Sequence, residues 1–181
     1  MRSGSVTALR GEADVTEHGD REEFTRWARA RQGHLLRASL LLTGDRQRAE
    51  DLVQEALAKV AMRWTRLRGT SPDAYARTVM YHDHVSWWRK RRREVLTAYD
   101  VERAEQGPEP ERRILLLAAL GALTPRQRAV IVLRYFEDLT ERQVAEVLGV
   151  SLGTVKSQTH LSLRRLREAA PELAEFLHEE S

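Results

Sequence analysis

The chain has 181 residues, of which 30 are Lys or Arg, 27 are Asp or Glu and none is Cys. This length fits one large domain or two small ones. Without cysteine the chain has no disulfide, no Cys-ligated metal site and no thiol nucleophile. No stretch is apolar over the roughly 18 residues that a membrane span requires, and the N-terminus lacks the apolar core of a signal peptide. We therefore expect a cytoplasmic protein that makes no use of a membrane.

The formal net charge of +3 is unevenly distributed along the chain. Residues 1–20 carry a net charge of −2, residues 21–93 carry +9 and residues 94–181 carry −4. Clustered arginines gain free energy on a polyanion because they release its condensed counterions. The strongly basic segment therefore predicts a nucleic-acid partner.

The first half of the chain reads as a tail followed by helices. Residues 1–20 are rich in Gly, Ser, Thr and acidic residues without an apolar period, which predicts a mobile tail. Residues 21–68 follow a helical pattern that is broken at residues 43–45, and a second helix begins near Arg46. A long basic helix is predicted over residues 72–93, with Ser71 as its N-cap and Pro72 in its first turn.

A charged segment rich in proline, residues 94–113, predicts a flexible acidic linker between two domains. Beyond it, three helix starts are marked by caps: Thr124 before Pro125, Thr140 with Gln143 as a capping box, and Ser151. The helices that follow these caps are expected to end near Phe136, Gly149 and Ala170.

No alternating strand pattern occurs, so the predicted fold class is all-α. We expect two small helical domains, the second a four-helix domain with a helix-turn-helix. The predicted boundaries are a tail over 1–20, a first domain over 21–93, a linker over 94–113 and a second domain over 114–181.

The clearest local motif lies between Thr140 and Arg167, where two helices are joined by a tight turn that contains Gly149. Such a pair is typical of a DNA-reading helix-turn-helix. On its second helix one polar face is formed by Lys156, Ser157, His160 and Arg164. These side chains suit contacts in a major groove. The alternative is a plain helical hairpin with a solvated polar face.

A second motif joins aromatic and basic residues, because Trp87 and Trp88 are followed directly by residues 89–93, all Arg or Lys. Aromatic rings can stack on unpaired bases while arginines follow the backbone of the strand. The alternative is a pair of core aromatics before a solvated cationic helix end.

A third motif is a polar face formed by Asp51, Gln54 and Glu55. This face is suited to docking on a basic protein surface, and the alternative is that it is simply solvated.

Enzymatic readings find no support in the sequence. The phosphate-binding and nucleophile-elbow motifs of nucleotide hydrolases and esterases are absent. His82 and His84 are two residues apart on a predicted helix, so they diverge and cannot share a metal ion. We expect neither catalysis nor a cofactor.

Three segments taken together, residues 50–55, 75–93 and 123–166, resemble bacterial RNA polymerase sigma factors of the extracytoplasmic-function (ECF) group, in particular an actinobacterial branch. The resemblance covers about residues 21–170. It implies a promoter-recognition subunit that binds core RNA polymerase and promoter DNA. Its first domain would read and melt the −10 element and its second would read the −35 element. An anti-sigma factor is a further candidate partner.

The resemblance implies three sets of site residues. The set that docks on the clamp of the largest polymerase subunit is Asp51, Gln54 and Glu55. The set at the −10 element is Tyr75, His82, Trp87, Trp88, Arg89, Arg91 and Arg92. The set at the −35 element is Arg134, Ser151, Thr154, Lys156, Ser157, His160 and Arg164.

The sequence departs from the family pattern at three of its positions. Tyr75 stands where Trp is usual, His82 where Asn often captures a flipped base, and Leu161 where a DNA-contacting Arg is common. The competing hypothesis is a stand-alone helix-turn-helix repressor or activator, in which residues 21–93 serve oligomerisation or sensing. Such a protein has no need of the aromatic-basic helix or of the acidic face.

Overall fold

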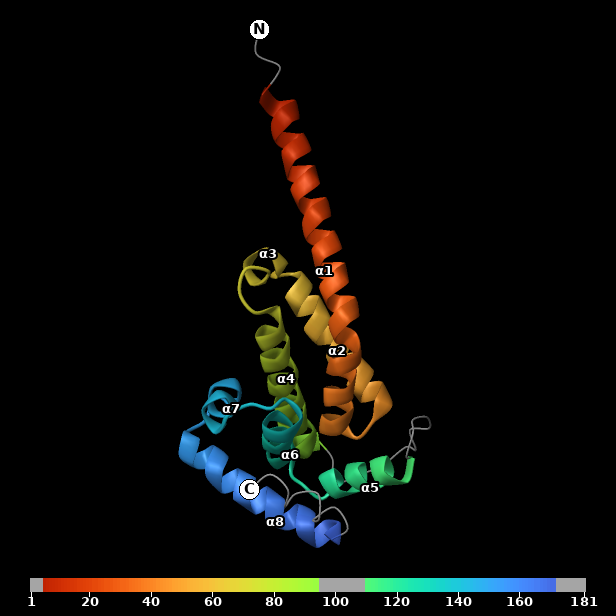
Figure 1. The fold of residues 1–181 in the computed structure, drawn as a ribbon, viewed down its shortest axis with the longest axis vertical. Helices are drawn as coiled ribbons and strands as arrows, with labels where there is room; N and C mark the ends of the chain where they lie inside the picture. Colours follow the sequence, from red (N-terminus) through yellow and green to blue (C-terminus); the bar gives the residue numbers. More distant parts are fainter. Residues whose placement is uncertain (1–4, 95–109, 172–181) are drawn as a thin grey trace.

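The computed structural model describes the backbone of residues 5–94 and 110–171, and the side chains of residues 19–90 and 114–171. All regular structure within these ranges is helical (Figure 1). The elements are α1 (Ser5–Thr43), α2 (Arg46–Ala61), α3 (Trp64–Leu67), α4 (Pro72–Glu94), α5 (Pro110–Gly121), α6 (Pro125–Ile131), the π-helical turn η1 (Val132–Phe136), α7 (Glu141–Leu148) and α8 (Leu152–Ala169). The all-α prediction is confirmed.

The longest helix, α1, runs for 39 residues, and its N-terminal part projects beyond the rest of the molecule (Figure 1). The sequence predicted a mobile tail over residues 1–20, whereas residues 5–20 continue α1 as helix. No proline interrupts this stretch, and its Ala, Glu and Arg residues are good helix formers, so the helix continues without an apolar stripe. Asp20 is tied to α3, since it forms an ion pair with Arg68 and accepts a 3.2 Å hydrogen bond from Thr65.

Helix α2 begins where the sequence predicted, after Asp45, whose carboxylate accepts a hydrogen bond from the backbone of Arg48. It ends at Ala61, and a short break separates it from α3, which the sequence did not distinguish. The Trp64 ring at the start of α3 is nearly buried against Phe24, at 5.5 Å between ring centroids, and Trp27, at 5.6 Å.

Helix α4 begins at Pro72 as predicted, and the Ser71 hydroxyl accepts a hydrogen bond from the backbone of Ala74 at 3.3 Å. Among the side chains described, its stripe of Ala76, Met80 and Tyr81 is buried. The helix lies between α2 on one side and α6 with α7 on the other (Figure 1). This central position brings the predicted −10 helix into contact with both halves of the chain.

In the C-terminal half, residues 110–171, the caps lie where the sequence placed them. Thr124 and Thr140 each form a full capping box with the Gln three residues later, and Ser151 accepts a hydrogen bond from the backbone of Thr154. Gly149 ends α7 in the left-handed conformation, with φ of 63°. One difference concerns the predicted helix over residues 125–136, whose last turn is the π-helical η1.

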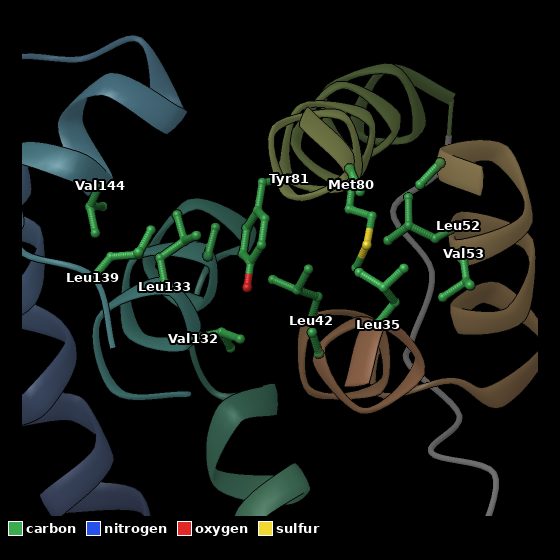
Figure 2. Packing of buried hydrophobic residues seen from close by; sticks show 14 of the residues in the cluster. Leu35, Leu42, Leu52, Val53, Met80, Tyr81, Val132, Leu133, Leu139 and Val144 are labelled. Carbon is green, nitrogen blue, oxygen red and sulfur yellow. The ribbon is translucent and has the colours of Figure 1, made fainter. Parts of the chain in front are cut away.

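One hydrophobic cluster contains buried residues from both halves of the molecule. Figure 2 shows Tyr81 of α4 with Leu133 of η1 on one side and Leu42 of α1 on the other. The fold has the two domains that the sequence predicted, and these domains pack directly on each other. Residues 95–109, which include most of the predicted linker, lie outside the described residues, so the exact domain boundaries remain predictions.

The aromatic contacts of Trp64 predict a large energetic cost when the ring is removed. Trp64→Ala should lower the free energy of unfolding by about 3–5 kcal/mol, because a buried ring is lost and a cavity remains. Met62→Ala, two residues away, is the matched control, since Met62 is 81% exposed. It should change the free energy of unfolding by less than about 0.5 kcal/mol. Urea titration followed by circular dichroism measures both, and equal losses would contradict the packing described here.

Candidate nucleic-acid and protein interfaces

The polar face predicted on α2 is exposed. Asp51, Gln54 and Glu55 lie at the surface, whereas Leu52 and Val53 beside them are buried. This alternation follows from the helical period, which turns one stripe into the core and leaves the opposite stripe to solvent. The two carboxylates and the amide of this face are exposed and contribute nothing to the hydrophobic core. It can dock a basic partner at small cost to the fold.

The three aromatic residues of α4 that belong to the predicted −10 set are half-buried. The rings of Trp87 and Trp88 meet edge to face at 5.2 Å between centroids, and the Arg48 guanidinium lies 4.6 Å from the centroid of the Trp87 ring. Tyr75 is half-buried too, with the Arg63 guanidinium 5.5 Å from its ring centroid. These rings pack on the molecule and remain partly exposed, so the core alternative and the stacking alternative each describe part of their environment.

The remaining residues of the predicted −10 set differ in what surrounds them. His82 is exposed, and its Nε2 lies 2.7 Å from the backbone oxygen of Val147 on α7. Arg89 is exposed and donates a hydrogen bond to Ser86 at 3.2 Å. Arg91 and Arg92 belong to α4, but their side chains lie outside the described residues.

The helix-turn-helix is formed by α7 and α8. Val155 and Leu166 fasten α8 to the core, while Lys156, Ser157 and His160 are exposed on another face. Arg164, one turn further along, is exposed and lies 3.9 Å from Glu168. The structure therefore brings together the polar face that the sequence predicted. Cations at the first turns of a recognition helix are suited to base edges and phosphates.

Three residues of the predicted −35 set also carry structural duties. Ser151 and Thr154 form the cap of α8, with their hydroxyl oxygens 2.8 Å apart. Arg134 is half-buried, donates a hydrogen bond to the backbone oxygen of Leu139, and lies over the ring of Tyr135 at 5.8 Å. Any contact of these residues with DNA would therefore be in addition to their hydrogen bonds within the protein.

Sequence reasoning missed the polar residues at the contact between the two halves. Arg128 of α6 is only 3% exposed and donates a 3.0 Å hydrogen bond to the backbone oxygen of Leu42. Glu137, directly after η1, accepts hydrogen bonds from Arg77 of α4 at 2.8 Å and pairs with His34 of α1 at 3.2 Å. No local pattern marks these residues, because each partner is far away along the chain.

Among the side chains described, no group of three His, Asp or Glu residues gathers as a metal ion would require. Over the same part of the chain no helix has both the length and the apolar character needed to cross a bilayer. The candidate binding surfaces described above consist of exposed charged side chains, an amide and partly exposed aromatic rings. A helix-turn-helix with exposed cations, next to an aromatic and basic helix, is typical of DNA-binding proteins of transcription.

Comparisons with known proteins identify the family. The model of sigma-70 region 2 matches residues 24–94, and that of sigma-70 region 4 matches residues 108–166. The RNA polymerase sigma-E factor of Streptomyces avermitilis is 39% identical over 155 residues, which cover 83% of this chain and 87% of the relative. The ECF RNA polymerase sigma factor SigL of Mycobacterium tuberculosis is 34% identical, covering 77% of this chain and 84% of the relative.

The chain belongs to the ECF RNA polymerase sigma factors. It is an initiation factor of transcription and not an enzyme, since sigma factors bind core RNA polymerase, which forms the bonds. The fold agrees with this. The sigma factor RpoE of Bartonella quintana, solved in complex with the anti-sigma factor NepR, superimposes with a TM-score of 0.66 at 24% identity. That similarity covers 82% of this chain and 96% of the solved one.

One prediction follows from the buried His84 at the contact between the two halves. Burial, together with the Arg128 and Arg48 guanidinium groups, lowers the pKa of His84 from 6.5 to about 3. Below pH 6.5 His84 is therefore protonated in the unfolded chain, whereas in the folded chain it stays neutral down to about pH 3. Stability falls across that window as the pH falls, and at pH 5 the loss is about 2 kcal/mol.

Urea titrations at pH 7 and pH 5 measure this loss. In His84→Gln the difference between the two pH values should shrink by about the same amount, because the titrating group is gone. The comparison within each protein removes any constant effect of the substitution. A variant that keeps the full pH dependence would show that other groups cause it.

Proposed function

We propose that this sigma factor divides promoter recognition among three of its helices. Helix α2 docks on the clamp of the largest polymerase subunit, α4 reads and opens the −10 element, and α8 reads the −35 element in the major groove. The observation that carries the proposal is that the docking set on α2 and the α8 members of the −35 set, Lys156, Ser157, His160 and Arg164, lie on exposed polar faces of separate helices. Each of these faces is opposite a buried stripe.

Support for the docking role comes from the charge and exposure of α2. The face of Asp51, Gln54 and Glu55 is acidic within the most basic segment of the chain, so it is unsuited to phosphate. A basic protein surface is the complementary partner.

Support for the −35 role comes from the exposed face of α8. Lys156 and His160 are one turn apart, near the N-terminal end of a helix that is capped by Ser151. That end of a recognition helix is where base-edge contacts are made in helix-turn-helix proteins.

Support for the −10 role comes from α4. Trp87 and Trp88 show only part of their rings to solvent, and Arg89 beside them is exposed. A base that leaves the duplex can stack on the exposed part of such a ring while the cations follow the backbone. His82 replaces the Asn of the family pattern and can both stack and donate a hydrogen bond.

We infer further that this sigma factor acts in the cytoplasm, where the polymerase and promoter are, and that an anti-sigma factor is one of its partners. The second inference is supported by the complex of one solved sigma factor of the same fold with an anti-sigma factor, and a second protein of this fold is also solved in complex with another chain. They are RpoE with NepR, and CnrH with the cytosolic domain of CnrY, the latter at a TM-score of 0.57.

Charge reversal on α2 tests the docking face. Asp51→Arg combined with Gln54→Ala should abolish pull-down with core polymerase, because a truncated partner of a desolvated charged contact costs about 2–5 kcal/mol. Glu23→Arg is the matched control, since it reverses an exposed acid on α1. Circular dichroism of the two proteins should be the same. Unchanged pull-down of the α2 variant would place the docking face elsewhere.

The two DNA roles are separated by substitutions on α8 and α4. Lys156→Ala should weaken holoenzyme binding to −35 duplex by roughly 1–3 kcal/mol, whereas Arg126→Ala, which removes an exposed cation of α6, should change it little. Trp88→Ala should leave duplex binding nearly intact and reduce strand opening, because stacking is worth about 1–3 kcal/mol only on an unpaired base.

Promoter fragments selected from genomic DNA by the holoenzyme serve as substrate. Permanganate reactivity of −10 thymines reports opening, and a thermal melt of each variant reports folding. A Trp88→Ala protein that melts normally and opens the promoter at full rate would contradict the role of α4.

A further inference from the structure

Helix α8 opens with an apolar side chain that the hydrophobic core does not use. Leu152 is the first residue of this helix, directly after the N-cap Ser151, and it is 39% exposed. It belongs to neither of the two hydrophobic clusters formed by the described residues. Val155, three residues later, is fully buried, so at this end of α8 the contact with the core is made by Val155 and not by Leu152.

The position of Leu152 on α8 distinguishes it from other exposed apolar residues, which are ordinary on a protein surface. Leu152, Lys156 and His160 follow one another at intervals of four residues, so they lie along one side of the helix. Lys156 and His160 are exposed members of the −35 set, and Leu152 extends their face toward the start of α8. Among the described residues, the other large apolar side chains that are exposed lie outside α8: Met62, Ile114, Leu116 and Tyr135.

The polar side chains beside Leu152 are already hydrogen-bonded within the protein. The Ser151 hydroxyl accepts a hydrogen bond from the backbone of Thr154 at 3.1 Å, and the hydroxyl oxygens of these two residues are 2.8 Å apart. The first cation of the face, Lys156, lies one turn further along the helix. The first turn of α8 therefore offers a base an apolar contact, in addition to any contact made by the two hydroxyls.

Gly153 leaves space beside Leu152. Its φ is not positive, and a Cβ atom built on it would meet only the Ser151 Oγ, at an ordinary 3.9 Å, so the fold does not require a glycine here. Within a helix glycine is less favourable than alanine by up to about 1 kcal/mol. Glycine is common where a ligand approaches the backbone closely. The missing side chain therefore suits the close approach of a partner to the first turn of α8.

Thymine is the base that Leu152 is suited to recognise. In the major groove of B-DNA every base pair presents hydrogen-bonding groups, and thymine alone adds an apolar group, its 5-methyl. Side chains at the N-terminal end of a recognition helix are those that contact base edges. An exposed isobutyl group in this place is complementary to a thymine methyl group, whereas it offers no hydrogen bond to the edge of a G·C pair.

We propose that Leu152 is a specificity-determining residue of this sigma factor: its side chain contacts the 5-methyl group of one thymine in the −35 duplex and favours an A·T pair over a G·C pair at that position. The proposal rests on the assignment of α8 to the −35 element and adds to it the chemical identity of one base. Burial of one methyl group is worth about 0.8 kcal/mol, which is about fourfold in affinity.

The position of that thymine is found by selection with the complete holoenzyme. Promoter fragments that keep a natural −10 element and carry a randomised −35 element are bound, recovered and sequenced. The unsubstituted sigma factor should favour thymine, on one strand or the other, by about fourfold over cytosine at one position. Leu152→Ala should lose this preference, whereas Leu152→Met keeps an apolar side chain and should retain it.

Removal of the methyl group alone then tests the contact itself. Deoxyuridine has the hydrogen-bonding groups of thymidine and lacks only the 5-methyl. In the unsubstituted holoenzyme, deoxyuridine at the selected position should weaken duplex binding about fourfold. Leu152→Ala should weaken binding to the thymine duplex by about the same factor, and in that variant deoxyuridine should have no further effect. Such non-additivity is the signature of two groups in direct contact.

Ile114→Ala is the matched control, because it removes a 48% exposed apolar side chain from α5. It should change neither the selected sequence nor the affinity. Thermal melts of the variants at residues 114 and 152 should nearly coincide with that of the unsubstituted protein, since exposed side chains contribute little to stability.

The proposal is overturned if deoxyuridine binds as well as thymine at every position of the −35 element, or if Leu152→Ala keeps the full thymine preference. The first result needs no substituted protein, so it decides the matter even if a variant does not fold. Lys156→Ala tests the assignment of α8 separately. If this variant also leaves duplex binding unchanged, the −35 role of α8 fails. If it weakens binding while Leu152→Ala does not, the thymine contact alone is refuted.

Discussion

One apolar stripe at the C-terminal end of α1 supports the whole arrangement. Leu35, Ala38 and Leu42 are buried, and α1 contacts α2 and α4 of region 2 as well as α6 and η1 of region 4. Burial of apolar surface is the largest favourable term in such packing, so the two regions share part of their stabilisation. Separating them exposes the Tyr81 ring and leaves the Leu42 carbonyl without Arg128.

Much of the fold could be predicted because its signals are local. Ser71 before Pro72, Thr140 with Gln143, and Gly149 each act within a few residues of themselves, and the structure places a helix end at all of them. What the sequence did not indicate depends on distant packing or on weak preferences. The π-helical η1 is chosen by its tertiary surroundings, and residues 5–20 are helical although they lack an apolar stripe. The break before α3 is of the same kind.

The site was predictable to the extent that a helical period sorts side chains into buried and exposed faces. That period identified the exposed residues of α2 and α8. It could not identify Glu137, whose partners Arg77 and His34 lie 60 and 103 residues away, nor Arg128, which reaches back 86 residues to Leu42. A charged residue that is buried by another domain has the same local sequence context as a solvated one. Tyr75, Trp87 and Trp88 of α4 fall between these cases, since they are partly buried and partly exposed.

The caps of the recognition helix have a consequence for how tightly it can hold DNA. The hydroxyl of Ser151 and the left-handed Gly149 fix both sides of the turn between α7 and α8 through bonds that span only a few residues. The backbone of α8 is therefore already ordered before DNA arrives, and little conformational entropy remains to be lost on binding. Affinity for DNA is then governed by a few side-chain rotamers. Small changes at this surface can retune which promoters are chosen without refolding the domain that carries it.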